Sequence, residues 1–357
     1  MAQLTSKTGK GGRMLLKSYN SVHPQSRPVV AKGISIISTL VLALVAVVSF
    51  ADAAALTIRA GYPQLNGGMA PLWLISEAKI DRQYGVDLKS VYIPGGARLT
   101  QTIVSGDVDI AITGGAAINA MLSGAEIIYL GMPVPTYAFS LYARPDIKEV
   151  PDLRGKVLGV ITKGASSDHA SIALLRQYKM TQGKDVKVLY FSRQQDALAA
   201  LDKGIVSAAV HSAPTTLMAR RLGYKELVNI GSLNLPYPFA GIAVRRSLIR
   251  QNPELVKAFL KAYLAALKVV HEQPGASKRA LAQYLASKDP EIIDEAYRAF
   301  APLLPKVPYV TEEAIREALS VTDHPKAATA DPKDFFDNRF LKELESTGFV
   351  KDLYGAR

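Results

Sequence analysis

Two short loops of small and polar residues are the clearest candidates for chemistry in this sequence. Thr113–Gly115 (TGG) and His211–Ala213 (HSA) each follow a short apolar segment and precede a helical pattern. Small residues let backbone N–H groups approach a ligand closely, and the N-terminus of a helix favours anionic groups. Both loops are therefore expected to bind a small molecule.

The two loops occupy the same place in an internal repeat. Residues 99–116 align with residues 197–214 when Gly106 is placed on Gly204. Each copy predicts a helix, a glycine that ends it, a buried strand and then the loop. One such unit can arise by chance, but two copies at equivalent places indicate two similar lobes. Ligands of open α/β sheets bind beyond the carboxyl ends of the strands, so the loops should face each other across a cleft.

Other junctions between a predicted strand and a predicted helix carry similar residues. Tyrosines near them could stack on a solute, whereas Asp168 could equally cap a helix and the glycines could equally serve turns. Arg98 and Arg193, near two helix starts, could clamp an anion or remain solvated surface charges. The residues expected to bind the ligand are Tyr62, Asn66, Gly67, Gly96, Thr113, Gly114, Gly115, Tyr137, Ser166, Ser167, Asp168, His211 and Ser212.

The elements that position these loops alternate between strands and helices. Strand and helix patterns alternate from residue 56 to residue 130, beginning with predicted strands over 56–62 and 86–93 and predicted helices over 70–84 and 96–105. The alternation is found again from residue 157 to residue 230. Such alternation is typical of parallel βαβ units with helices on both faces of a sheet. Two longer extended segments, Thr136–Arg144 and Phe239–Arg245, predict hinge strands that join the two lobes.

The last part of the chain is mainly helical and is expected to pack on the first lobe. Asn252 and Pro253 predict a helix start, and apolar residues recur at helical spacing after them. We therefore expect an α/β fold in which residues 54–138 form the first part of lobe I and residues 139–240 form lobe II. Residues 241–357 then complete lobe I and add the C-terminal helices.

The first 53 residues have the pattern of a leader for export. Residues 1–33 contain six basic residues and no acid, and residues 34–51 form an apolar run that leads into the motif ADA at 51–53. Such a sequence is typical of a cleaved secretory signal peptide, with Met14 as an alternative start. The other interpretation is a membrane anchor, for which about 18 apolar residues are the lower limit. A lipoprotein is excluded because the chain has no cysteine.

Charge and composition narrow the class of function. The formal net charge of +12 falls to +7 without residues 1–53, which hold six basic residues and one acid. This mild positive charge favours anionic solutes, and no basic stripe interleaved with aromatic residues indicates nucleic-acid binding. The absence of cysteine excludes disulfides, thiol nucleophiles and thiolate metal sites. No dinucleotide fingerprint, P-loop or nucleophile elbow is present, and no cofactor is expected.

Several short motifs resemble those of one known family. They are GYP at 61–63, APLW at 70–73, GVDL at 85–88, SGDVD at 105–109, DLRGK at 152–156 and the stretch 334–348, which ends in LKELESTG. In their order and spacing they resemble the periplasmic solute-binding proteins of the nitrate, sulfonate and taurine type, a family grouped with the yeast thiamine-pyrimidine synthase. The resemblance spans about residues 56–350.

This resemblance implies the type II periplasmic-binding fold, in which two α/β lobes close over a ligand. It implies a periplasmic monomer that binds a small solute, such as a sulfonate, nitrate or carboxylate, and delivers it to the permease of an ABC transporter. The ligand loops of the family fall on residues 62–68, 95–96, 113–115, 166–168 and 211–213. One departure is Ser207, where the family often has an aspartate. This position lies in a predicted strand, so the change bears on packing.

An enzyme of the thiamine-pyrimidine synthase type, acting on a small heterocycle, is the main alternative function. The yeast enzymes carry a cysteine-rich motif, which this chain lacks. A metal site made of Asp168, His169 and His211 is a weaker alternative, because the histidines do not share one helical face at a ligand spacing. The sequence therefore favours a binding protein without catalytic or metal-binding residues, and it does not identify the solute.

Overall fold

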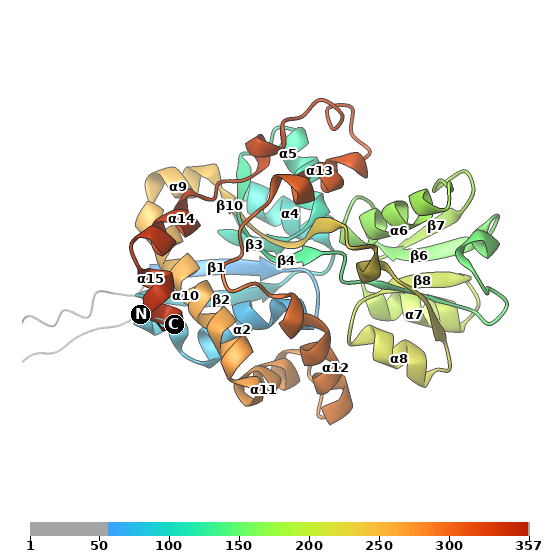
Figure 1. The fold of residues 1–357 in the computed structure, drawn as a ribbon, viewed down its shortest axis with the longest axis horizontal. Helices are drawn as coiled ribbons and strands as arrows, with labels where there is room; N and C mark the ends of the chain where they lie inside the picture. The colour runs from blue at the N-terminus through green and yellow to red at the C-terminus, as the bar shows by residue number, and fades with distance from the viewer. Residues whose placement is uncertain (1–55, 356–357) are drawn as a thin grey trace, which may run out of the picture. The chain divides into compact units, whose positions relative to one another are not determined.

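The computed structural model describes residues 56–355, so the leader predicted for residues 1–53 lies outside the described residues. The described chain forms two five-stranded sheets with helices around them (Figure 1). We call the part around the first sheet lobe I and the part around the second sheet lobe II. In sheet order, the strands of lobe I are β2 (Val86–Tyr92), β1 (Leu56–Tyr62), β3 (Ile110–Thr113), β10 (Pro236–Arg245) and β4 (Ile127–Thr136). Those of lobe II are β7 (Lys187–Phe191), β6 (Val157–Ile161), β8 (Ala208–His211), β5 (Ser140–Ala143) and β9 (Lys225–Asn229).

The two sheets have the same topology. In lobe I, β1 pairs in parallel with β2 and β3, and β10 runs antiparallel between β3 and β4. In lobe II, β6 pairs in parallel with β7 and β8, and β5 runs antiparallel between β8 and β9. The chain enters lobe II between β4 and β5 and returns to lobe I at β10. The predicted α/β fold with two lobes joined by two crossing segments is therefore confirmed, although residues 239–245 of the second predicted segment lie within β10 of lobe I.

Helices connect the strands and follow the last one. The helices before β10 are α2 (Ala70–Glu77), α3 (Ile80–Gln83), α4 (Gly96–Ser105), α5 (Gly115–Leu122), α6 (Ser166–Gln177), α7 (Gln194–Asp202) and α8 (Thr215–Arg221). Those after β10 are α9 (Arg246–Gln251), α10 (Pro253–Glu272), α11 (Pro274–Tyr284), α12 (Pro290–Phe300), α13 (Glu312–Ser320), α14 (Arg339–Ser346) and α15 (Phe349–Tyr354). Short 3-10 turns are η1 (Gly67–Met69), η2 (Val150–Leu153), η3 (Ile230–Leu233), η4 (Ala301–Leu303) and η5 (Pro332–Phe335). The helix predicted over 70–84 is two helices, because Lys79 adopts a left-handed backbone conformation (φ 55°) between them.

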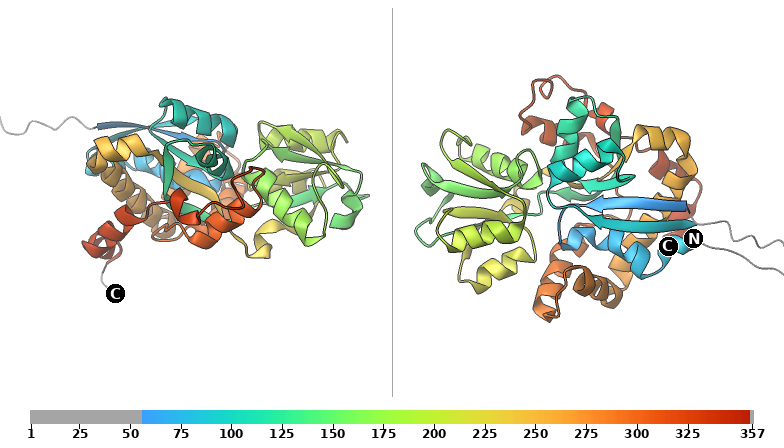
Figure 2. Two further views of the ribbon diagram at one scale, coloured as in Figure 1. Left: turned by 90° about the horizontal axis from the view of Figure 1, so that it is seen from above. Right: turned by 180° about the vertical axis from the view of Figure 1, so that it is seen from behind.

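The C-terminal helices lie against lobe I, as predicted. Helices α10 and α11 pack on α2, and α14 packs on β4. Figure 2 shows these orange and red helices beside the blue strands of lobe I in both views. Asn252 begins α10 as predicted, because its Oδ1 accepts a hydrogen bond from the backbone N–H of Leu255 at 3.1 Å. Within residues 56–355, no helix is both long and apolar enough to span a membrane.

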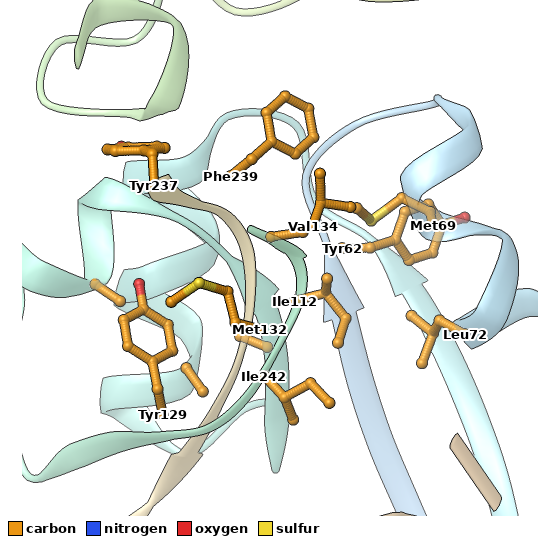
Figure 3. Close-up of a cluster of buried hydrophobic side chains, with 14 of the residues drawn as sticks. Tyr62, Met69, Leu72, Ile112, Tyr129, Met132, Val134, Tyr237, Phe239 and Ile242 are labelled. Atoms are coloured by element: carbon orange, nitrogen blue, oxygen red, sulfur yellow. The ribbon is translucent and has the colours of Figure 1, made fainter. Parts of the chain in front are cut away.

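A continuous apolar core fills lobe I. Figure 3 shows Ile112 of β3, Tyr129 and Met132 of β4, and Ile242 of β10 close together between the strands. All four side chains are fully buried. Helices cover both faces of this sheet, so its central strands are continuous apolar runs rather than alternating ones. The core fixes the strand ends, and with them the loops that follow.

The internal repeat has the same structure in both lobes. Helix α4, strand β3 and helix α5 correspond to α7, β8 and α8. Gly106 and Gly204 follow the first helix of each copy with left-handed backbone angles, φ 92° and φ 70°. A Cβ at Gly106 would meet the side chain of Arg245, and one at Gly204 would meet that of Arg144. In each lobe, the glycine of the repeat therefore lies against an arginine at the end of the antiparallel strand, β10 in lobe I and β5 in lobe II.

Candidate functional site

The strand-end loops of the two lobes meet at Gly114 and Ser166. Gly114 precedes α5 of lobe I, and Ser166 begins α6 of lobe II. A Cβ at Gly114 would collide with Ser166 Oγ and would lie 2.6 and 2.7 Å from the carbonyl oxygens of Pro238 and Phe239. The hydroxyl of Ser166 donates a hydrogen bond to the Phe239 carbonyl at 3.2 Å. Only glycine fits at position 114 while the lobes are in this contact.

Asn66 and Ser212 make a second contact between the lobes. The side-chain amide of Asn66 lies 3.5 Å from Ser212 Oγ and also donates a hydrogen bond to Gln64 at 2.7 Å. Gln194 donates to Ser212 Oγ at 2.8 Å and accepts from the Ser212 backbone N–H at 2.6 Å. Asn66 and Ser212 are both fully buried. This second pair of predicted residues is therefore joined by a hydrogen-bond network across the lobes.

Gly96 lies at a third close contact between the two lobes. A Cβ at Gly96 would lie 3.4 Å from the Cβ of Ala165 in lobe II. The space left between the loops is about 20 Å³, and it is bordered by Gly96, Gly114, Ser166 and Ser167 among others. Such a space holds about one water molecule. A solute can enter between these loops only when the lobes separate.

Ser167 and Asp168 hold the loop of lobe II in place. Ser167 Oγ accepts a hydrogen bond from the backbone N–H of Ile161 and donates to its carbonyl, both at 2.9 Å. Asp168 accepts hydrogen bonds from the backbone N–H of Gly164 at 2.8 Å and from Gln182 at 3.0 Å. Burial raises the pKa of the Asp168 carboxyl. Both side chains therefore have internal partners.

Tyr62, Gly67 and Thr113 also have neighbours within lobe I. The ring of Tyr62 meets Trp73 edge-on, with the centroids 5.5 Å apart. A Cβ at Gly67 would collide with the carbonyl oxygen of Ala296 in α12. Thr113 Oγ1 lies 3.4 Å from Thr100 Oγ1. Tyr62, Gly67 and Thr113 do not border the space between the loops.

Two tyrosines stack where the chain crosses between the lobes. The rings of Tyr137 and Tyr237 lie 4.0 Å apart at an angle of 16°. The hydroxyl of Tyr137 donates to Glu317 at 3.2 Å, and that of Tyr237 lies 2.9 Å from His169 Nδ1. A Cβ at Gly115 would collide with the Tyr237 hydroxyl, so the first residue of α5 must also be small. The pair joins both crossing segments to α5 and α6.

Sequence reasoning identified Tyr137 and missed its partner. A Tyr-x-Phe pattern occurs in both crossing segments, at 137–139 and at 237–239. The two phenylalanines also face each other, with their centroids 4.9 Å apart. This repeated pattern is a signal from which Tyr237 could have been found. Burial lowers the pKa of His169, which contacts Tyr237, to about 4.

His211 is a buried polar residue in the loop region of lobe II. It ends β8, its side chain is fully buried, and neither ring nitrogen has a hydrogen-bond partner within residues 56–355. Burial lowers its pKa to about 3, so the imidazole is neutral near pH 7, with one donor and one acceptor nitrogen. With Tyr137 and Ser212, it borders a cavity of about 360 Å³.

A larger cavity, of about 1020 Å³, lies beside α6. Asp168 and His169 border it, together with Lys163, Lys179 and Tyr190. In the part of the chain that the structure describes, neither lysine forms an ion pair within 4.0 Å. This cavity is therefore more basic on its rim than the cavity at His211.

The arginine and metal alternatives gain no support from the geometry. Arg193 pairs with Asp196 at 2.8 Å, and Arg98 is exposed. Neither arginine borders any of the three spaces described above. Among residues 56–355, no group of three histidine or acidic side chains is arranged to hold a metal ion.

Comparison with known proteins identifies relatives of this chain. The model of the family described as NMT1/THI5 like matches residues 82–277, more than half of the 357 residues. A Brachyspira hyodysenteriae protein named as an ABC transporter periplasmic binding protein is 23% identical over 284 residues, which cover 75% of this chain and 79% of that protein.

Solved structures show the same fold. The alkanesulfonate-binding protein SsuA of Xanthomonas axonopodis pv. citri, bound to MOPS, has a TM-score of 0.65 and 20% identity, covering 80% of this chain and 96% of that one. The nitrate-binding protein NrtA of Synechocystis PCC 6803 has a TM-score of 0.66 and 13% identity, covering 84% and 91%. The expected periplasmic-binding fold and the family resemblance are therefore confirmed.

Proposed function

Because the chain belongs to the NMT1/THI5-like family, we propose that it captures a small solute and delivers it to the permease of an ABC transporter. One observation carries this proposal. Loops beyond the carboxyl ends of parallel strands in two similar lobes meet at Gly114, which follows β3, and at Ser166, which follows β6, as expected of lobes that close over a ligand. The relatives support it, since their names describe an ABC transporter binding protein, an alkanesulfonate-binding protein and a nitrate-binding protein.

The solute would lie between lobe I, assigned to residues 54–138 and 241–357, and lobe II, assigned to residues 139–240. Residues 236–240 are moved to lobe I, because they belong to β10 and pair with β4. The two crossing segments would act as the hinge. Of the residues predicted to bind it, Gly96, Gly114, Ser166 and Ser167 border the small space between the loops. Tyr137, His211 and Ser212 border a second, separate cavity of about 360 Å³. These seven residues are the ones we retain as direct contacts.

We place the protein in the periplasm as a monomer. The support is the leader pattern of residues 1–53, with its cleavage motif at 51–53, and the periplasmic name of the Brachyspira relative. No catalytic step is assigned to the chain, because the relatives named above are binding proteins.

Binding measurements on protein recovered from the periplasm test this function. N-terminal sequencing should find a start near Ala54, and calorimetry should find one solute bound per chain. The probes are ethanesulfonate, nitrate, benzoate and benzamide, each recovered afterwards for mass analysis. Protein that keeps its leader in the membrane would contradict the assigned location. A probe that is converted over many turnovers would contradict the assignment as a binding protein.

A further inference from the structure

His211 differs in its hydrogen bonding from the other polar side chains in the loops where the two lobes meet. Asn66, Ser166 and Ser212 all have hydrogen-bond partners within the chain, whereas both ring nitrogens of His211 lack one among residues 56–355. Buried polar groups are almost always paired, with protein, water or a ligand. The cavity that His211 borders has about 360 Å³, a volume that falls within the range of small-molecule sites.

The charges around this cavity do not suit an anion. Among residues 56–355, Arg220 is the one cationic side chain on its border, and it already donates to Glu295 at 2.7 Å and to the Tyr142 hydroxyl at 3.1 Å. Glu226, also on the border, accepts a hydrogen bond from Tyr142 at 3.3 Å. The border of the cavity therefore holds two carboxylates, those of Glu226 and Glu295, and one guanidinium, that of Arg220, beside the neutral imidazole of His211. An anion placed there would be desolvated without a free positive charge to meet it.

The walls of the cavity suit the apolar body of a solute. Phe139 and Phe300 border it on the side of the hinge and of α12, and both rings are buried. Ser140 lies opposite His211 in the β5–β8 pairing and adds a hydroxyl group. The cavity thus combines apolar walls with a few hydrogen-bonding groups, the usual composition of a small-molecule site.

We propose that the cavity at His211 is the subsite that recognises the solute, and that it selects an uncharged solute. Both ring nitrogens of His211 are covered in the described packing, so the solute would reach one of them, and exchange one hydrogen bond with it, when the lobes separate. This inference rests on the proposed function and narrows it, because the net charge of the chain alone favours an anion. The local charges act at contact distance, whereas the net charge is spread over the whole surface.

Matched pairs of probes separate the two solute classes. Benzamide and benzoate, nicotinamide and nicotinate, and benzenesulfonamide and benzenesulfonate have similar shapes and differ in charge near pH 7. Calorimetric titration of the mature protein, with probes up to millimolar concentration, should find at least one uncharged member binding at least about tenfold more tightly than its anion. If no uncharged member binds, or if the anions bind as tightly, the proposal is wrong.

Variants of His211 locate the probe. His211→Leu removes both hydrogen-bonding nitrogens at similar volume and should weaken the uncharged probe by at least about tenfold. His211→Gln keeps one donor and one acceptor group and should retain most of the affinity. Lys179→Gln, on the rim of the larger cavity, is the matched control and should bind like the wild type. Equal binding by His211→Leu, or weaker binding by Lys179→Gln, would place the probe elsewhere and overturn the proposal.

Thermal melting of solute-free protein separates loss of binding from loss of folding. His211→Leu should melt no lower than the wild type, because an apolar group replaces an unpaired polar one. If it fails to fold, His211→Gln and the matched probes still decide between the solute classes. An anion that binds wild type and His211→Leu equally would overturn this inference and leave the proposed function standing. Conversion of a probe would instead contradict the proposed function.

Discussion

The two copies of the helix–glycine–strand–loop unit have the same backbone and different chemistry. In lobe I, Thr113 contacts Thr100, and the carbonyl of Gly114 accepts a hydrogen bond from the Tyr129 hydroxyl at 2.6 Å. In lobe II, the aligned residues are His211 and Ser212. Ser212 is bound by Gln194, but His211 has no partner within residues 56–355.

This difference assigns different tasks to the two lobes. The loop of lobe I is built from glycines, whose missing side chains let lobe II approach as closely as Ser166 approaches Gly114. The loop of lobe II carries side chains that can hydrogen-bond, and one of them, His211, has no partner in the part of the chain that the structure describes. We therefore interpret lobe I as the surface shaped for closure and lobe II as the source of the recognition group.

The largest expected effect is a loss of folding stability at acidic pH. Burial lowers the pKa of His211 to about 3 and that of His169 to about 4, whereas unfolded histidine titrates near 6.5. Below about pH 6.5 the unfolded chain therefore binds protons that the folded chain excludes, and the free energy of unfolding falls until the folded pKa is reached. One pKa unit corresponds to about 1.4 kcal/mol, so each histidine should remove on the order of 3 kcal/mol between about pH 6.5 and pH 4.

Denaturant titrations at a series of pH values test this effect by comparing variants at the two aligned positions of the repeat, 211 and 113. His211→Thr gives lobe II the residue of lobe I and should flatten the loss of stability on acidification. Thr113→Val, at the aligned position, should leave the pH dependence of the wild type unchanged. If His211→Thr loses stability with the wild-type slope, then the imidazole is protonated as easily in the folded chain as in the unfolded one.

The second effect concerns the contact between the lobes. Gly114→Val would press a side chain against Ser166 and two hinge carbonyls, so it should destabilise the chain by about 1–3 kcal/mol. Because 1.4 kcal/mol corresponds to tenfold in affinity, we also expect at least about a tenfold loss of solute binding. Gly275→Val is the control, since the nearest atom to a Cβ there belongs to Arg279, 3.7 Å away. A Gly114→Val chain that melts and binds like the wild type would mean that the lobes do not close through this contact.

Much of the fold could be predicted from the sequence because its signals are local. The helix predicted over 96–105 is α4 with those bounds, since Gly106 ends it by its left-handed conformation. The strands β1 and β2 also lie where alternation and apolar runs predicted them. By contrast, nothing in the local pattern predicted the break at Lys79, because lysine rarely adopts a positive φ.

The site could be predicted only as a set of loops. Position after a strand selected Gly114 and Ser166, which lie in contact, but the repeat paired the loop of Gly114 with that of His211. The same rule also selected Gly67, which packs on Ala296 in α12. That neighbour lies more than two hundred residues later in the chain, so no local pattern reports it. That His211 has no hydrogen-bond partner among the described residues is likewise a property of its folded surroundings, and the residue type alone does not reveal it.

The smallest expected effect compares the hydroxyl groups of the two loops. Ser212→Ala removes the acceptor of the Gln194 amide and leaves that buried donor unpaired, which should cost about 1–3 kcal/mol of unfolding free energy. Thr113→Val should cost less than about 1 kcal/mol, because its partner Thr100 still donates to the Gly96 carbonyl at 2.8 Å. Denaturant titration of solute-free protein near pH 7 measures both, with the exposed Ser232→Ala as a control expected within about 0.5 kcal/mol of the wild type. Equal losses at both positions would mean that the loops contribute alike to the folded state. A larger loss at Ser212 supports the division of tasks, because only the loop of lobe II then depends on its side chains.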